Sequence, residues 1–156
     1  MIYTTISIGD IMASIYEGVR SFKSKYPGTI AWRIKKHSEV VQGFLNPGEK
    51  VVYCFCGQKN DNWYDIFTSA VVVLTNKRLL IGQKRVVWGS FFTQITPDLY
   101  NDMKVYRGLT FGKIIIDTVK EEVVLSNLSK SALSEIETNI SEFMMREKKK
   151  YRDNSK

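Results

Sequence analysis

The chain has 156 residues and a mass of 18.0 kDa, which fits one globular domain, or a small domain with an appended helical arm. Hydrophobic residues make up 44% and charged residues 25%, close to the averages for soluble proteins, so a disordered or collagen-like chain is excluded. The formal net charge of +7 is spread over the chain, with +3 in residues 1–48, +2 in 49–128 and +2 in 129–156. The positive charge is therefore not concentrated in one segment.

Two amphipathic helices are predicted at the N-terminal end. Apolar residues recur at spacings of three, four and seven between residues 8 and 26, and Pro27-Gly28 ends this helical pattern. A second helical period runs from Ile30 to Leu45 and stops at Asn46-Pro47-Gly48. Because an apolar stripe looks the same whichever surface it covers, three roles stay open: packing across the rest of the domain, mediating assembly, or serving as a detachable docking arm.

Beyond Gly48 apolar residues tend to recur at every second position, and β-branched and aromatic residues dominate, which predicts strands. Asn76-Lys77 predicts a tight turn between the second and third strands, because Asn tolerates positive φ. Short strands joined by short turns favour an antiparallel meander that bends to hide its edges. The seven predicted strands span residues 50–56, 67–75, 78–82, 85–92, 102–107, 110–117 and 121–125.

A last helix is predicted to begin with Ser129 or Ser131 as its N-cap and to reach Met144. Its apolar residues share one face. Since the strands cannot bury both faces of their sheet by themselves, we expect this helix to close the open end of a strongly bent sheet.

Three short segments stand in a recognisable order and spacing. They read LNPGEKV at residues 45–51, LTNKRLLI at 74–81 and RGLTFGKI at 107–114. They resemble, in turn, the L-x-x-G-E-x-V, L-T-N-K-R-L-I and G-L-x-x-G-x-I segments of the bacterial pleckstrin-homology (PH)-like domains of the YokE-like group. The resemblance spans about residues 45 to 145.

The resemblance implies a mainly β fold with flanking helices: a PH-like bent antiparallel barrel of about seven strands closed by a C-terminal α-helix, plus an N-terminal two-helix arm. The expected division is a helical arm at 1–46, a PH-like domain at 47–146 and a basic tail at 147–156. Within the hairpin motif, Lys77 and Arg78 are expected to keep the tip of the turn solvated. These residues specify a scaffold, so they do not identify a ligand.

The loop of the first predicted hairpin has the sequence GQKNDNWYDIF. Eukaryotic PH domains that hold phosphoinositides place several Lys and Arg residues there, whereas this loop has only Lys59, opposed by Asp61 and Asp65, which argues against a phosphoinositide ligand. The aromatic residues Trp63 and Tyr64 either fold back over the mouth of the barrel or contact a protein partner.

The densest basic cluster is the tail at residues 146–152, with five basic groups and one acid. It is either a solvated helix end or a contact for an anionic surface, shared with the second hairpin. The candidate anionic-surface residues are Lys77, Arg78, Lys148, Lys149, Lys150 and Arg152.

Residue types with catalytic or metal-binding chemistry are scarce. One His and two Cys leave no room for a four-ligand zinc site, and Cys54 and Cys56 are expected to be buried, reduced thiols. His37 lies on the apolar side of its helix and is expected to be a packing residue. No nucleophile elbow, P-loop or H-E-x-x-H pattern is found, so we expect no enzyme, no metal and no cofactor.

No apolar run approaches the roughly 18 residues that cross a bilayer, and the first ten residues lack the basic and apolar blocks of a secretory signal, so a soluble, intracellular protein is expected. The resemblance to bacterial PH-like domains implies a cytoplasmic location. The leading hypothesis is a non-catalytic PH-like binding or assembly module that contacts a protein or further copies of itself. The alternative is weak peripheral binding to an anionic membrane surface through the basic tail and hairpin. Nucleic-acid binding ranks third, because no basic, aromatic-lined sheet motif is visible.

Overall fold

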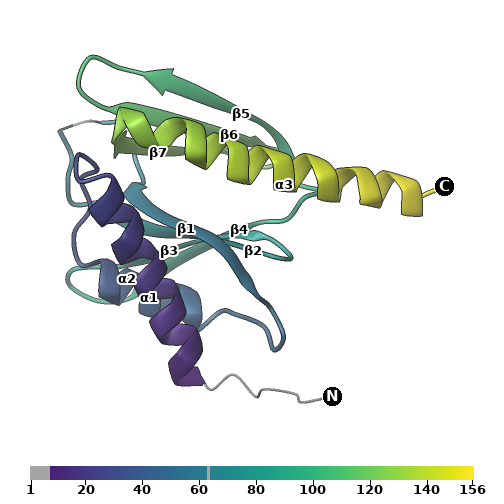
Figure 1. The fold of residues 1–156 in the computed structure, drawn as a ribbon, viewed down its shortest axis with the longest axis horizontal. Coiled ribbons are helices and arrows are strands. Elements are labelled where there is room, and N and C mark those ends of the chain that lie inside the picture. The colour runs from purple at the N-terminus through teal and green to yellow at the C-terminus, as the bar shows by residue number, and fades with distance from the viewer. Residues whose placement is uncertain (1–7, 63) are drawn as a thin grey trace.

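The computed structural model describes residues 8–62 and 64–156, with side chains from residue 15 onward. It contains a seven-stranded antiparallel sheet, two N-terminal helices and a long C-terminal helix (Figure 1), which confirms the predicted composition of elements. The helices are α1 (Ile8–Lys25), α2 (Ile34–Gln42) and α3 (Leu133–Asn154), with a 3₁₀ turn (Lys130–Ala132) before α3. The strands are β1 (Val51–Gln58), β2 (Ser69–Thr75), β3 (Leu79–Lys84), β4 (Ser90–Ile95), β5 (Tyr100–Arg107), β6 (Gly112–Thr118) and β7 (Glu122–Leu128).

The strand order is β4-β3-β2-β1-β7-β6-β5, so the sheet consists of two meanders that meet at β1 and β7. These two strands pair at a single position, where Gln58 lies opposite Ser126. β4 and β5 are the two ends of the order, so hydrogen bonds do not close the sheet. The expectation of a closed barrel is wrong in this respect: the sheet bends because its halves splay apart at this junction. Helix α3 runs along the β5–β6 half and buries its apolar face there (Figure 1).

The N-terminal helices pack across one face of the β1–β3 half. Helix α1 contacts β1 and α2, and α2 contacts β2 and β3. The approach is close, since a Cβ added at Gly82 of β3 would lie 2.5 Å from Val41 of α2. Every residue of β2 is buried, because helices cover one face of this half and the rest of the core covers the other. Of the three roles left open for these helices, the structure shows packing across the sheet.

A polar contact also connects α1 with α3. The Lys25 ammonium lies 2.7 Å from one carboxylate oxygen of Glu135, and the Tyr53 hydroxyl donates to the other oxygen at 2.9 Å. Glu135 is in the first turn of α3, where a carboxylate is also favoured by the helix dipole. Both N-terminal and C-terminal helices are thereby fixed to β1.

The structure corrects the position of the fourth strand. Residues 85–92 were expected to be extended, but β4 begins at Ser90, and Arg85–Gly89 forms the turn between β3 and β4. The Arg85 N–H donates to the Gly89 carbonyl at 3.1 Å, and Gly89 has φ of +81°, a value that glycine adopts without strain. Val86, Val87 and Trp88 therefore lie in an exposed loop instead of a strand.

Two helix boundaries also differ from the expectation. The predicted second helix begins at Ile30, whereas α2 begins at Ile34, because the Ile30 N–H donates to the Asn127 carbonyl at 3.0 Å and so continues an extended segment. Helix α3 continues through the basic residues of the tail to Asn154. The end of α3 projects beyond the sheet (Figure 1).

Candidate functional site

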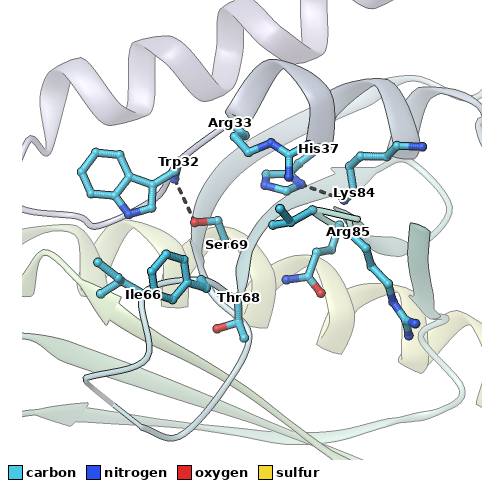
Figure 2. A pocket seen from close by; sticks show the side chains of 11 residues that line it. Trp32, Arg33, His37, Ile66, Thr68, Ser69, Lys84 and Arg85 are labelled. Atoms are coloured by element: carbon cyan, nitrogen blue, oxygen red, sulfur yellow. Dashed lines mark hydrogen bonds between the residues drawn. The ribbon is translucent and has the colours of Figure 1, made fainter. Parts of the chain in front are cut away.

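A cleft of about 260 Å³ opens where the linker between α1 and α2, the segment before β2 and the end of β3 meet. Figure 2 shows the side chains that converge on it. We call it the Trp32 cleft; it is lined by Trp32, Arg33, His37, Ile66, Phe67, Thr68, Ser69, Gln83, Lys84, Arg85 and Val86. Next to it is the hairpin tip, which we define as residues Arg85–Gly89 between β3 and β4.

Buried polar groups at the base of the cleft are bonded to one another. The Ser69 hydroxyl oxygen accepts hydrogen bonds from the Trp32 backbone N–H at 2.8 Å and from the Gln58 side-chain amide at 2.8 Å. His37 Nδ1 accepts the Lys84 backbone N–H at 2.8 Å (Figure 2). Burial, together with the nearby charge of Arg33, lowers the pKa of His37 to about 4, so the imidazole is neutral at pH 7. The base of the cleft is therefore uncharged at pH 7, and hydrogen bonds hold its side chains in place.

Gln58 joins two of the segments that meet here, the linker and the start of β2, to β1. Its side chain is fully buried at the single pairing between β1 and β7. Its amide nitrogen donates to the Ile30 carbonyl at 3.0 Å as well as to Ser69, and its amide oxygen accepts the Thr68 hydroxyl at 3.2 Å. Because a buried amide is costly unless its donors and acceptors are used, these bonds fix the linker and the start of β2 relative to β1.

The rim of the cleft is apolar and cationic. Trp32 is 52% exposed, Phe67 80% and Val86 71%, so all three present large apolar surface to solvent. Arg33, Lys84 and Arg85 add three positive charges, and none of the lining residues is a carboxylate. Within the described part of the chain, the side chains of these three cations make no hydrogen bond or ion pair.

The hairpin tip extends this apolar surface. Val87 is 86% exposed and Trp88 is 83% exposed, and both follow Val86 directly in the chain. Large exposed apolar residues that gather in one place mark interaction surfaces, whereas single ones are ordinary. The Trp32 cleft and the hairpin tip together form the candidate binding site.

The structure places the predicted partner residues only in part. Trp63 lies outside the described residues. Tyr64 is 69% exposed and belongs to the same loop as Phe67. Whether Tyr64 contacts a partner stays a prediction.

The loop charges differ from the expected pattern. The Lys59 ammonium lies 3.7 Å from the centre of the Phe91 ring, and burial lowers the pKa of this lysine. Asp61 pairs with Lys113 at 2.7 Å instead of opposing Lys59. Asp65 accepts the Phe67 backbone N–H at 3.1 Å. The loop cations and acids therefore stabilise local structure.

Arg78 was expected to keep the turn between β2 and β3 solvated, but its side chain is only 11% exposed. It donates to both carboxylate oxygens of Glu49, at 3.0 and 3.1 Å, and to the Phe44 carbonyl at 2.7 Å. The turn itself depends on Thr75, whose hydroxyl oxygen accepts the N–H groups of Lys77 and Arg78, both at 3.1 Å. The Arg78 guanidinium is thus occupied by internal partners.

Asn76 also acts differently from the expectation. Among the described non-glycine residues only Arg33 and Asn127 have positive φ, so Asn76 does not serve the turn in that way. Instead, its side-chain oxygen accepts the Lys50 N–H at 2.8 Å, and its own N–H donates to the Lys50 carbonyl at 2.9 Å. This pair of bonds ties the turn to the start of β1.

The remaining predicted anionic-surface residues lie at the β2–β3 turn and on the end of α3. Lys77, Lys149 and Arg152 are exposed. Lys148 donates to the Tyr100 carbonyl, and Lys150 pairs with Glu147 at 2.9 Å. The turn and the helix end meet at a second hollow of about 660 Å³, whose lining includes Lys77, Arg78 and Tyr151. Contact of these residues with an anionic surface stays a prediction.

The two cysteine thiols are buried and protonated at pH 7. Cys54 and Cys56 are free and buried, and burial raises the pKa of the Cys54 thiol to about 11 and that of Cys56 to about 12. Among the described residues no cluster of three or more His, Cys, Asp or Glu side chains is placed to hold a metal ion. In the same part of the chain, no helix has the length and apolar character needed to span a bilayer.

Sequence reasoning missed the residues of the Trp32 cleft. They come from three segments that are far apart in the chain, so no local pattern joins them. One local signal was present: Gly89 follows three consecutive apolar residues, and a glycine at that place suits a turn with positive φ. The alternation expected of a half-buried edge strand is missing from Val86-Val87-Trp88.

Two antiparallel meanders bent around a core and covered by a C-terminal helix define the PH-like fold, and this site has the character of a binding surface. The sequence profile described as "Bacterial PH domain" matches residues 45–142, more than half of the chain, so this chain belongs to the bacterial PH domain family. That family is generally non-catalytic. Membership in the YokE-like group and the boundaries at residues 47 and 146 stay predictions.

Two solved structures are similar to this chain. The pleckstrin homology domain from Shewanella amazonensis SB2B has 14% identity and a TM-score of 0.43, with 72% of this chain and 86% of that chain covered. A DUF1696 family protein with a pleckstrin-homology domain from Shewanella loihica PV-4 has 13% identity and a TM-score of 0.47, with 78% and 98% covered. No match was found among curated proteins.

Proposed function

We propose that this chain is a non-catalytic binding module whose partner is a protein, either a different protein or a second copy of the chain. The observation that carries this proposal is the exposed apolar surface formed by Trp32, Phe67 and Val86 around one cleft, continued by Val87 and Trp88. Tryptophan buries a large area at low entropic cost, and such residues dominate the binding energy of many protein interfaces.

The chemistry of the site supports a non-catalytic role. General acid–base and nucleophilic catalysis need a group with a pKa near the working pH or an activated nucleophile. His37 is buried with a lowered pKa and accepts a backbone N–H, and the Ser69 hydroxyl oxygen already accepts two hydrogen bonds. The two thiols are protonated at pH 7, because their pKa values are raised.

Self-association is tested by the mass of the protein in solution. Light scattering at tens of micromolar should give a multiple of 18.0 kDa if copies bind each other. Trp88→Ala should then lower the mass, whereas Met145→Ala, which removes an apolar side chain that is 67% exposed on α3, should not. A monomer mass for the native chain would refute self-association and leave a different protein as the partner.

A different protein is tested by affinity purification with the native chain and with a Trp32→Ala/Phe67→Ala/Trp88→Ala variant. These side chains are at least half exposed, so the variant should keep the fold, which circular dichroism checks. Each recovered protein is then purified, and its binding to both chains is measured directly. Equal affinity for the native chain and the triple variant would contradict the assignment of this surface.

A further inference from the structure

We propose that the Trp32 cleft binds an acidic peptide segment of the partner and takes up one large apolar side chain of that segment. This inference rests on the proposed function and specifies the chemistry of the partner. Three observations support it: the size of the cleft, the composition of its wall and base, and the charge of its rim.

The cleft has the size for a side chain and is too small for a typical cofactor. Its volume is about 260 Å³, which is below the roughly 300 to 1,000 Å³ of pockets that enclose small molecules. A leucine, methionine or phenylalanine side chain fits in such a volume and would contact the faces of Trp32 and Phe67. One residue of a larger molecule can fill the cleft while the rest of that molecule stays outside it.

Two buried polar pairs at the base of the cleft are already hydrogen-bonded within the protein. The Trp32 and Lys84 backbone N–H groups both donate to buried side chains, and the Ser69 and His37 acceptors are used by these same bonds. With these polar groups engaged, removal of the apolar wall from water is the main gain on binding. An apolar side chain realises that gain.

The rim determines the charge of the segment around that side chain. Arg33, Lys84 and Arg85 are among the residues that line the cleft, and within the described part of the chain no carboxylate pairs with them. Carboxylates of an incoming segment would complement these charges and speed its association. Arg33 has φ of +54° at the N-cap of α2, a conformation that favours glycine or asparagine, and it makes no side-chain cap bond. Helix capping therefore does not account for an arginine at this position.

The concave shape favours a peptide segment over a membrane. A bilayer surface could contact Val87 and Trp88 at the hairpin tip, but a flat surface leaves the wall between Trp32 and Phe67 in water. A flexible segment can enter the cleft and contact the tip at the same time. Contact with an anionic membrane is the outcome that the experiment must separate from this one.

The test is a selection from a random peptide library displayed on phage, with the full chain immobilised as the target. Recovered peptides are synthesised with a fluorophore, and their affinities are measured by anisotropy for the native chain and its variants. We expect recovered peptides to carry Asp or Glu next to a large apolar residue. Trp32→Ala should weaken binding by about tenfold or more, as for an interface anchor, and Arg85→Glu by about fivefold.

Lys77→Glu is the matched control, because it reverses an exposed charge at the opposite end of β3 and should change the affinity by less than about twofold. Peptides that bind Trp32→Ala and Arg85→Glu as tightly as the native chain would overturn the cleft assignment and leave the proposed protein-binding function standing. Recovered peptides without acidic residues would overturn the charge assignment. A third outcome would refute both this inference and the proposed function. In that outcome no peptide is recovered, the native chain co-sediments with phosphatidylglycerol vesicles, and Trp88→Ala abolishes this co-sedimentation.

Discussion

Replacement of Arg78 by Ala should cost this protein a large part of its stability. The Arg78 guanidinium donates twice to Glu49, and it also donates to the Phe44 carbonyl and to Gln94. The Glu49 side chain is only 1% exposed. Removal of one partner from a buried ion pair leaves an uncompensated charge, which costs about 3 to 5 kcal/mol. Thr75 still donates to the Glu49 carboxylate at 2.6 Å, so we expect the lower end of this range.

The assay is urea unfolding followed by circular dichroism, on Arg78→Ala, Glu49→Gln and the double variant. A loss of about 3 kcal/mol corresponds to a fall in Tm of about 6 to 12 °C in a chain of this length. The double variant should lose less than the sum of the single losses, by about 1 to 3 kcal/mol, because the charge that Arg78→Ala strands is then absent. Lys77→Ala, at the exposed neighbouring position, should change stability by less than about 0.5 kcal/mol.

The pH dependence gives an independent check on the same pair. Burial alone would raise the pKa of Glu49, but hydrogen bonds from Arg78, the Asn46 N–H and Thr75 lower it below its ordinary value of 4.5. The stabilisation from this carboxylate is therefore present above pH 4.5 and is lost as the pH falls through the lowered folded value. The difference in stability between the native chain and Arg78→Ala should shrink over that range. A loss below about 1 kcal/mol at pH 7, or strictly additive single losses, would refute the reasoning.

Three further tests concern the packing and the buried titratable groups. Gly82→Ala places a Cβ 2.5 Å from Val41 and should lose about 1 to 3 kcal/mol in urea unfolding, whereas Gly43→Ala, with no neighbour nearer than 3.5 Å, should be nearly neutral. The lowered pKa of His37 means that the unfolded state binds the proton more tightly, so stability should fall as the pH drops from 6.5 to about 4. His37→Asn, which keeps an acceptor for the backbone N–H, should flatten that slope, and an unchanged slope would contradict the assignment. Both buried thiols should resist a thiol-specific reagent at pH 8 until urea unfolds the chain, and rapid labelling of the folded protein would show that they are accessible.

Helices and strands could be predicted from the sequence where the spacing of apolar residues matches the residues that are buried in the structure. The run of β-branched residues predicts β2 and the apolar face predicts α3, and the structure confirms both elements. The turn at Arg85–Gly89 was missed because Val86, Val87 and Trp88 are good strand formers. Their exposure comes from pairing between β3 and β4 that ends at Lys84 and Ser90. The register between two strands cannot be predicted from the sequence of either strand alone.

The role of Arg78 was not predictable for a different reason. Adjacent Lys77 and Arg78 look like a solvated turn, yet the two side chains differ in burial because Arg78 points back towards a carboxylate 29 positions earlier in the chain. The sequence motifs at residues 45–51 and 74–81 supply Glu49 and Arg78 respectively, together with Asn76 and Lys50, which bond to each other. The two signature segments are thus joined by a buried ion pair between Arg78 and Glu49 and by an exposed bond between Asn76 and Lys50.

The Trp32 cleft has a different relation to the family. Trp32 and Arg33 precede the matched region at residues 45–142, and Phe67 and Arg85 lie outside the three signature segments. The signature residues are buried or form turns, so substitutions there act on the fold, whereas the rim residues are exposed and their replacement leaves the core intact. Family membership therefore fixes the scaffold and not the ligand. Under the proposed function, surface from the linker between α1 and α2 together with the hairpin tip would specify the partner, and relatives without this linker would lack one wall of the cleft.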